Sequence, residues 1–187
     1  VNSIGARLPR LLALVEHLQP DVICVQETKC TPEKFPHLPL EGAGYVAADH
    51  SGGRWAGVAV IARSELGVED VTIGLPGEPA ADEARWIEAT VDGVRCVSTY
   101  VPNGQALGTE PFAQKLVFLE AMAHRATALA GGPTVIAGDM NVCPTDLDVW
   151  NPDQVHGATH ITPDERNRLR AVIDTGYVDS FRHIHPD

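Results

Sequence analysis

The sequence has few aromatic residues, only 5% of its 187 positions, and no apolar run near the roughly 18 residues that a membrane-spanning helix needs. It also shows no charged segment followed by an apolar stretch, so a secretory leader has no support. The hydrophobic share of 44% is ordinary for a globular protein and excludes disorder of the whole chain. We expect one domain, residues 1–187, with a sizeable core.

Cysteines are few and scattered. Cys24, Cys30, Cys96 and Cys143 form no C-x-x-C pair, which argues against a zinc ribbon. Cys24 and Cys96 stand in apolar, strand-like runs and are expected to be free, buried thiols. This usage predicts a reducing, cytoplasmic setting.

The net charge of −11 argues at first against a nucleic-acid partner. Its distribution weakens that objection, because residues 64–94 carry eight acids and one base, whereas residues 1–63 carry six of each. An acidic segment can coexist with a phosphate-binding patch elsewhere. Acidic enzymes that act on phosphates often recruit a divalent cation to supply the missing positive charge.

Hydrophobic spacing predicts helices and strands in an order typical of an α/β protein, with mixed sheets layered with helices. The segment beginning at Thr162 reads as a capping box with proline at the first helical position. Residues 142–160 read as a long loop, and residues 64–84 as loop with an edge strand. The predicted elements are helices at 7–18, 111–130 and 163–175 and strands at 22–25, 57–62, 86–91, 94–101 and 134–137.

Polar residues follow three of the predicted strands. Glu27 and Lys29 follow the first, Tyr100 closes another, and Asp139 and Asn141 follow a third. Strand ends are where layered α/β folds assemble sites from distant parts of the sequence. In extended chain Asp139 and Asn141 would point to the same side. A carboxylate at the end of a buried strand needs a partner, such as a divalent metal or a hydrogen-bond network.

Each of these residues also has a purely structural interpretation. Glu27 could be a capping acid or form a salt bridge with Lys29, Tyr100 could belong to the core, and Asp139 and Asn141 could close a loop. The histidines are expected to have no functional role: His183 and His185 in a solvated tail, His156 and His160 in a loop.

Taken together, four motifs resemble the exonuclease III family. They are Asn2-Ser-Ile with Ala6-Arg-Leu-Pro9 and then Pro20-Asp-Val through Gln26-Glu-Thr-Lys29; Tyr100-Val-Pro-Asn-Gly104; Gly138-Asp-Met-Asn141 followed by Pro144-Thr-Asp-Leu-Asp148; and Val178-Asp-Ser-Phe-Arg182. The resemblance runs in order over essentially the whole chain. It implies a four-layer α/β sandwich of the endonuclease/exonuclease/phosphatase type.

The resemblance also implies Mg²⁺- or Mn²⁺-dependent cleavage of duplex DNA: 3′→5′ exonuclease action, incision at abasic sites and removal of blocked 3′ ends. By position, Glu27 would hold the metal, with Asp139, Asn141 and Asn2 as further ligands. Tyr100 would touch the scissile phosphate or assist the attack. Asp139 would orient or deprotonate the attacking water, and Asn141 would donate to the transition state.

This chemistry agrees with the residue types: a carboxylate base supplies the nucleophile, a metal neutralises charge, and an amide donates without adding repulsion. Lys29, Arg54, Arg85 and Asn103 are candidates for contacts with DNA. For the three bases, the alternative is a solvated surface charge. We expect a monomer.

The chain departs from the family pattern at both ends. An aromatic–Asn pair that the family places just before Val1 is absent, and Gly5 stands where the family often has Arg. Residues 142–187 hold no counterpart of the family's further Asp and closing Asp-His pair. We expect the extreme N-terminus and the C-terminal part of the domain to be missing, and the 187 residues alone to be inactive or nearly so.

Two other functions are compatible with parts of the sequence. A phosphatase acting on inositol or lipid head groups is disfavoured by Arg7-Leu-Pro9 and by residues 178–182, which resemble the nuclease branch. A non-catalytic, nuclease-like binding domain is disfavoured because Glu27, Tyr100, Asp139 and Asn141 are all retained.

Overall fold

The computed structural model describes residues 1–155 and 157–186, so the prediction for His156 lies outside the described residues. The chain divides into two compact units. The first unit consists of Val1–Leu75, Ala80–Tyr100 and Gly132–Asp139, and the second of Pro76–Pro79, Val101–Gly131 and Met140–Asp187. The chain therefore passes from the first unit to the second directly after Tyr100 and again directly after Asp139.

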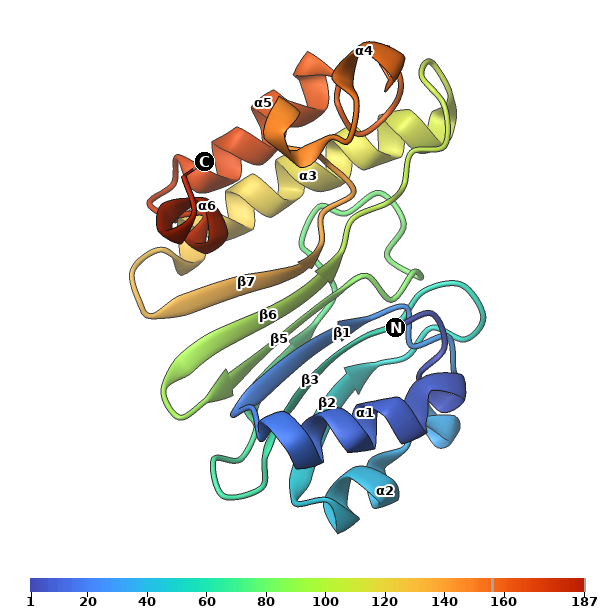
Figure 1. The fold of residues 1–187 in the computed structure, drawn as a ribbon, viewed down its shortest axis with the longest axis vertical. Helices are drawn as coiled ribbons and strands as arrows, with labels where there is room; N and C mark the ends of the chain where they lie inside the picture. The colour runs from blue at the N-terminus through green and yellow to red at the C-terminus, as the bar shows by residue number, and fades with distance from the viewer. Residues whose placement is uncertain (156, 187) are drawn as a thin grey trace. The chain divides into compact units, whose positions relative to one another are not determined.

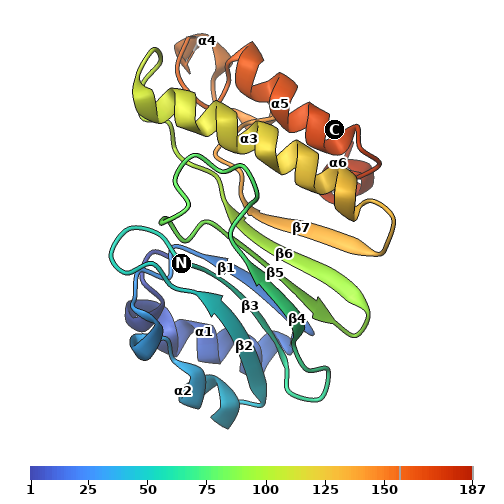
Figure 2. The same ribbon diagram turned by 180° about the vertical axis from the view of Figure 1, so that it is seen from behind.

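The first unit holds two β-sheets and two α-helices, whose arrangement is shown in Figures 1 and 2. One sheet has the strand order β1-β3-β2 and is antiparallel, and the other has the order β4-β5-β6-β7, with only the β6–β7 pair parallel. In chain order the elements are α1 (Ile4–Leu18), β1 (Val22–Gln26), the 3₁₀ helix η1 (Pro32–Lys34), α2 (His37–Gly42), β2 (Tyr45–His50), β3 (Val58–Arg63), β4 (Glu69–Ile73), β5 (Trp86–Val91), β6 (Val94–Tyr100) and β7 (Thr134–Asp139).

The central strand β3 is apolar on both faces, and this places it between two layers. Ala59 and Ile61 pack in one core with residues of α1 and α2. Val58, Val60 and Ala62 pack in a second core with residues of β5 and β6. Because successive strand residues face opposite sides, one short apolar run joins helices, first sheet and second sheet into three layers.

The parallel pairing of β6 with β7 sets the position of the predicted site residues. Its register places Thr99 opposite Gly138 and Tyr100 opposite Asp139. A Cβ atom on Gly138 would lie 1.9 Å from the carbonyl oxygen of Thr99, so only glycine allows this approach. Tyr100 and Asp139 therefore end neighbouring strands at the same edge of the sheet.

The second unit is helical. Its elements are α3 (Glu110–Leu129), the 3₁₀ helix η2 (Asp146–Asp148), α4 (Pro152–Val155), α5 (Pro163–Ile173) and α6 (Ser180–Ile184). Helices α3 and α5 lie side by side (Figures 1 and 2). The predicted capping box is confirmed: the Thr162 side chain accepts from the Glu165 backbone N–H, and the Glu165 carboxylate accepts from that of Thr162.

Most predicted elements are confirmed, and the misses have physical reasons. The strand β2 was missed because its sequence, Tyr45-Val-Ala-Ala-Asp-His50, has few β-favouring residues. The strand is stabilised by its pairing with β3, which the local sequence does not reveal. The short helix α2 was missed because it contains proline and glycine. The segment predicted as one loop, 142–160, contains η2 and α4. Within the described residues, no helix combines the length and apolar character needed to cross a membrane.

Candidate functional site

Glu27, Lys29 and Asn2 form a polar group in the first unit. The Lys29 Nζ lies 2.6 Å from Glu27 Oε2 and donates to Asn2 Oδ1 at 2.7 Å. The Glu27 and Lys29 side chains are each 26% exposed, so water reaches the pair. The salt bridge that the sequence allowed for Glu27 is therefore present. The Lys29 ammonium lies between Glu27 Oε2 and Asn2 Oδ1, two oxygens that are predicted to bind a metal.

The backbone at this group is in an unusual conformation. Asn2, Glu27 and Lys29 have φ angles of 50°, 57° and 49°, in the left-handed region that non-glycine residues rarely adopt. Such conformations persist only where the surroundings hold them, and they concentrate at functional sites. Here the backbone N–H of Ser3 donates to the carbonyl of Glu27 at 2.8 Å, and that of Lys29 donates to the carbonyl of Ala56 at 2.9 Å.

Tyr100 lies against Arg85 at the end of β6. The Arg85 guanidinium lies 4.8 Å from the centre of the Tyr100 ring, and the Tyr100 backbone N–H donates to the Arg85 carbonyl at 2.8 Å. Burial raises the pKa of the Tyr100 hydroxyl, and the carboxylates of Glu27 and Asp139 raise it further against the opposing charges of Arg85 and Lys29. The hydroxyl therefore stays protonated, as a hydrogen-bond donor, near the predicted metal ligand Glu27 and the predicted base Asp139.

Hydrogen bonds between the two sheets explain why Glu27 acts on Tyr100. Gln26, the last residue of β1, donates from Nε2 to Ser98 Oγ at 3.0 Å. Ser98 in turn donates from Oγ to the carbonyl of Val25 at 3.0 Å. These bonds tie the end of β1 to the end of β6; Glu27 directly follows β1, and Tyr100 is the last residue of β6.

The oxygens of this group suit a hard divalent cation. Mg²⁺ and Mn²⁺ prefer carboxylate, amide and water oxygens, and Glu27 and Asn2 supply the first two; Asp139, the last residue of β7, carries a further carboxylate. The Lys29 ammonium already occupies a cationic position between Glu27 and Asn2. Among the described residues there is no cluster of three or more His, Cys, Asp or Glu side chains able to hold a metal. The carboxylate and amide oxygens that are present fit a hard divalent cation by their chemical type.

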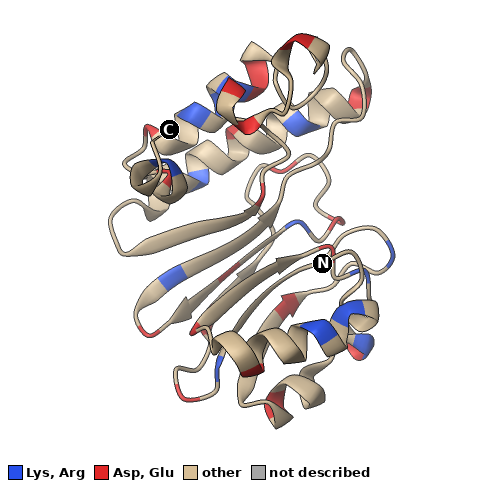
Figure 3. Ribbon diagram, viewed as in Figure 1, with Lys and Arg blue, Asp and Glu red and all other residues tan. Residues whose placement is uncertain are grey.

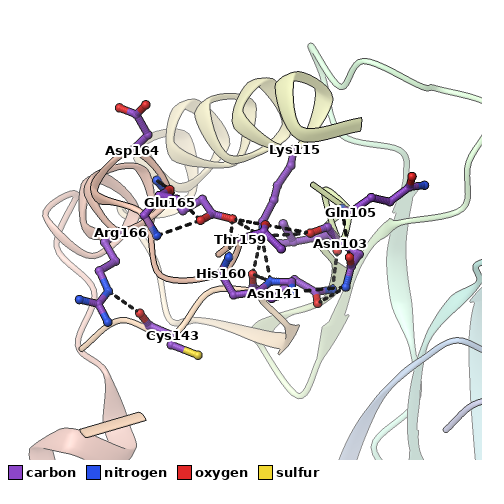
Figure 4. Close-up of polar contacts among 12 residues, drawn as sticks. Asn103, Gln105, Lys115, Asn141, Cys143, Thr159, His160, Asp164, Glu165 and Arg166 are labelled. Carbon is purple, nitrogen blue, oxygen red and sulfur yellow. Dashed lines mark hydrogen bonds and ion pairs between the residues drawn. The ribbon is translucent and has the colours of Figure 1, made fainter. Parts of the chain in front are cut away.

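Asn103 and Asn141 meet in the second unit (Figure 4). The Asn141 amide donates from Nδ2 to the carbonyl of Val101 at 2.9 Å, and Asn103 Nδ2 donates to Asn141 Oδ1 at 3.4 Å. Asn141 has a φ of 48° and follows the end of β7, so the extended-chain argument that grouped it with Asp139 is wrong at this residue. Its side-chain direction is instead set by the Val101 carbonyl.

The remaining predicted residues lie at the surface. Arg54 is exposed in the loop before β3, with its guanidinium 4.9 Å from the centre of the exposed Trp55 ring. His183 and His185 are exposed, as expected, although His183 belongs to α6. Figure 3 shows most charged residues on helices and loops and few on the strands.

Sequence reasoning missed a buried polar cluster around Lys115 in the second unit. The Lys115 and Glu165 side chains are both fully buried, and their charged atoms lie 2.5 Å apart. His160, predicted to be an unremarkable loop residue, lies 3.1 Å from the Lys115 Nζ through its Nδ1. The signal was a charged residue in helical register with Phe118 and Met122 on the buried face of α3.

Comparison with known proteins gives matches over nearly the whole chain. The sequence profile described as the Endonuclease/Exonuclease/phosphatase family matches residues 1–181. Exodeoxyribonuclease III of Haemophilus influenzae is 29% identical, and the match covers 100% of this chain and 74% of that protein. The chain spans only 26% and 55% of the length of two other curated relatives that it matches.

Two solved structures have the same fold. An AP endonuclease from Archaeoglobus fulgidus superposes with a TM-score of 0.95 at 34% identity, covering 100% of this chain and 72% of that one. A 3′ phosphatase from Neisseria bound to a product DNA hairpin gives a TM-score of 0.96 at 32% identity, covering 100% and 73%. The α/β fold class expected from the sequence, of the endonuclease/exonuclease/phosphatase type, is thereby confirmed.

Proposed function

Because the chain belongs to the Endonuclease/Exonuclease/phosphatase family, as an exonuclease III-type member, we propose that its protein is a divalent-metal-dependent nuclease of DNA repair. Its proposed substrates are abasic sites and 3′ ends in double-stranded DNA. The observation that carries the proposal is the convergence of Glu27, Tyr100 and Asp139 at three strand ends: Tyr100 is paired with Asp139 in the β6–β7 register, and Gln26, next to Glu27, donates to Ser98 of β6.

Glu27 and Asn2, with Asp139, would hold the Mg²⁺ or Mn²⁺. When bound, the cation neutralises the charge that grows on the phosphate during attack. The Lys29 ammonium, which lies against Glu27 and Asn2, supports this assignment because it shows that a positive charge is stable there.

The other roles follow from the chemistry of each side chain. Asp139 would accept the proton of the attacking water, since a carboxylate at a strand end can act as a general base. The protonated Tyr100 hydroxyl and the Asn141 amide would donate hydrogen bonds to phosphate oxygens without adding negative charge. Because Val101 fixes its amide group, we assign Asn141 this donor role in preference to the ligand role first considered.

Lys29, Arg54, Arg85 and Asn103 are the proposed contacts with the DNA backbone. The Arg54–Trp55 pair offers both a charge and an exposed ring. We further propose that residues 1–187 belong to one catalytic domain of a monomeric protein that works in the reducing cytoplasm. The single family match over residues 1–181 and the four free thiols support this.

The test is cleavage by the full-length protein of three duplexes: one with an abasic site, one with a recessed 3′ hydroxyl and one with a 3′ phosphate, each with and without Mg²⁺. Asp139→Asn removes the base while keeping the shape, so cleavage should fall by at least about 100-fold while DNA binding persists. The matched control is Asp92→Asn, in the turn between β5 and β6 at the opposite end of the strands.

Cleavage that requires Mg²⁺, is lost in Asp139→Asn and is kept in Asp92→Asn supports the proposal. Equal rates for wild type and Asp139→Asn would refute the role of Asp139. Binding of abasic DNA without cleavage of any of the three duplexes would favour the non-catalytic alternative. Turnover of an inositol phosphate alone would favour the phosphatase alternative.

A further inference from the structure

Lys115 is an unusual lysine. It lies in α3, and its side chain is 0% exposed, as is that of Glu165 (Figure 4). Lysine almost always keeps its ammonium in water, and a buried charge is tolerated only where partners surround it. A buried ion pair is weak evidence for stability, because hydrophobic residues of similar size often serve a core as well. The presence of this buried ion pair therefore indicates a role besides folding.

The ammonium of Lys115 contacts the two loops that carry the proposed phosphate-binding amides. It donates to the backbone carbonyl of Asn141 at 2.6 Å and lies 3.3 Å from that of Asn103. A lysine ammonium has three donor hydrogens and no acceptor, so it suits a point where carbonyl oxygens converge. Lys115 thereby links the segment after β6 to the segment after β7.

The loop at Asn103 is shaped to fit against this side chain. Gly104 has a φ of +84°, and a Cβ atom placed on it would lie 2.9 Å from Lys115 Cδ. Glycine is therefore needed both for the backbone conformation and for the approach of the loop to the lysine. The loop and the lysine are packed as one structure.

Glu165 holds the ammonium in place and is itself held. Its carboxylate accepts from Thr159 Oγ1 at 2.9 Å, from the His160 backbone N–H at 2.8 Å and from Thr162 Oγ1 at 2.7 Å. Burial alone would raise the pKa of Glu165, but the hydrogen bonds, led by that from Lys115, lower it to about 2. The carboxylate is ionised at neutral pH and forms a rigid anchor at the start of α5.

Asn141 is consequently held through both its backbone and its side chain. Its backbone carbonyl accepts from Lys115 and lies 2.5 Å from His160 Nδ1, and its side-chain amide donates to the carbonyl of Val101 and accepts from Asn103. Its φ of 48° is a conformation that needs such support. Loss of the Lys115 contact would therefore remove one of the restraints on the direction of the amide.

We propose that Lys115, anchored by Glu165, is a positioning residue that sets the orientation of Asn141 and, more weakly, of Asn103 toward the DNA phosphate. The inference rests on the nuclease function proposed above. It does not require Lys115 to touch DNA. Because the contact with Asn141 is the shorter one, loss of Lys115 acts chiefly on the chemical step and less on DNA binding.

The test compares Lys115→Met with Lys34→Met, the same substitution at an exposed lysine of η1, in the full-length protein. The first readout is the side-chain amide NMR signal of Asn141. ¹⁵N-asparagine labelling restricts the side-chain signals to asparagines, of which residues 1–187 contain five, and Asn141→Ala identifies the one required. The second readout is the steady-state kinetics on abasic duplex DNA.

In Lys115→Met we expect the Asn141 signal to move and kcat to fall roughly 10- to 100-fold, as for a reacting group displaced by about 1 Å, with KM nearly unchanged. Lys34→Met should change neither readout. Glu165→Gln keeps an oxygen that accepts from Lys115, so it should lie between the two. If Lys115→Met does not fold, Glu165→Gln decides by the same two readouts.

The two proposals fail in distinguishable ways. An active wild type whose Asn141 signal and kcat are unchanged by Lys115→Met overturns the positioning role and leaves the nuclease function standing. If the wild type is inactive on all three duplexes, the nuclease function is overturned. If Lys115→Met nevertheless moves the Asn141 signal, the positioning contact is supported.

Discussion

Two lysine–glutamate ion pairs, one in each unit, have nearly the same length and very different surroundings. Lys29 and Glu27 lie 2.6 Å apart with each side chain 26% exposed, whereas Lys115 and Glu165 lie 2.5 Å apart with both fully buried. An exposed pair contributes little to stability, because water and salt screen it. A buried pair cannot be broken without leaving an uncompensated charge in the interior.

The difference indicates two uses of the same chemistry. The partly exposed pair can open, so its oxygens are accessible to another cation, and in the proposed function Glu27 would exchange the lysine for a metal. The buried pair is fixed, so it can define the geometry of the backbone around Asn141.

The largest expected effect is on stability. Lys115→Met leaves Glu165 buried without its cation and should lower the free energy of unfolding by about 3–5 kcal/mol. Lys29→Met, the same substitution in the exposed pair, should change it by no more than about 1 kcal/mol. Urea unfolding of both variants measures this, and equal losses would remove the contrast between the two pairs.

The second effect is on acid stability. The pKa of Glu165 is lowered from an ordinary 4.5 to about 2 by its hydrogen bonds, so the folded state favours the ionised carboxylate. The resulting stabilisation is complete above pH 4.5 and disappears as the pH falls toward 2, because the unfolded state takes up the proton first. Glu165→Gln should flatten this part of the curve of unfolding free energy against pH. The wild-type loss should persist in about 0.5 M salt, since buried pairs are weakly screened; a loss that vanishes in salt would point to exposed groups.

The contrast between the units also explains what sequence could predict. Glu27, Tyr100 and Asp139 could be proposed from the sequence because each stands at or next to the end of a predicted strand, which is a local signal; the structure places them at the ends of β1, β6 and β7. Lys115 and Glu165 were missed because they lie 50 residues apart and only the packing of α3 on α5 joins them. The capping box at Thr162 was predicted, but nothing in it shows that Glu165 also reaches across to another helix.

A third effect is on metal binding in the first unit. Glu27→Gln replaces a charged ligand by a neutral one and should raise the Mn²⁺ concentration needed for half-saturation by about 10-fold, the effect of losing roughly 1.4 kcal/mol. Electron paramagnetic resonance of Mn²⁺ reports binding without relying on activity. Glu16→Gln, on an exposed position of α1, is the matched control. An unchanged Mn²⁺ titration in Glu27→Gln would remove Glu27 from the ligand set.

The smallest expected effect is on the Mn²⁺ affinity of a Lys29 variant. It tests whether a metal can replace the lysine in the partly exposed pair with Glu27. If the ammonium occupies the position that a cation takes, Lys29→Met removes a competitor and frees both Glu27 Oε2 and Asn2 Oδ1. Mn²⁺ should then bind a few-fold more tightly, since an exposed pair is worth no more than about 1 kcal/mol. Weaker Mn²⁺ binding would instead mean that Lys29 organises the ligands, and the exposed pair would then resemble the buried one in its role. Lys34→Met, which removes one positive charge from an exposed site elsewhere in the first unit, separates local competition from a general change in charge.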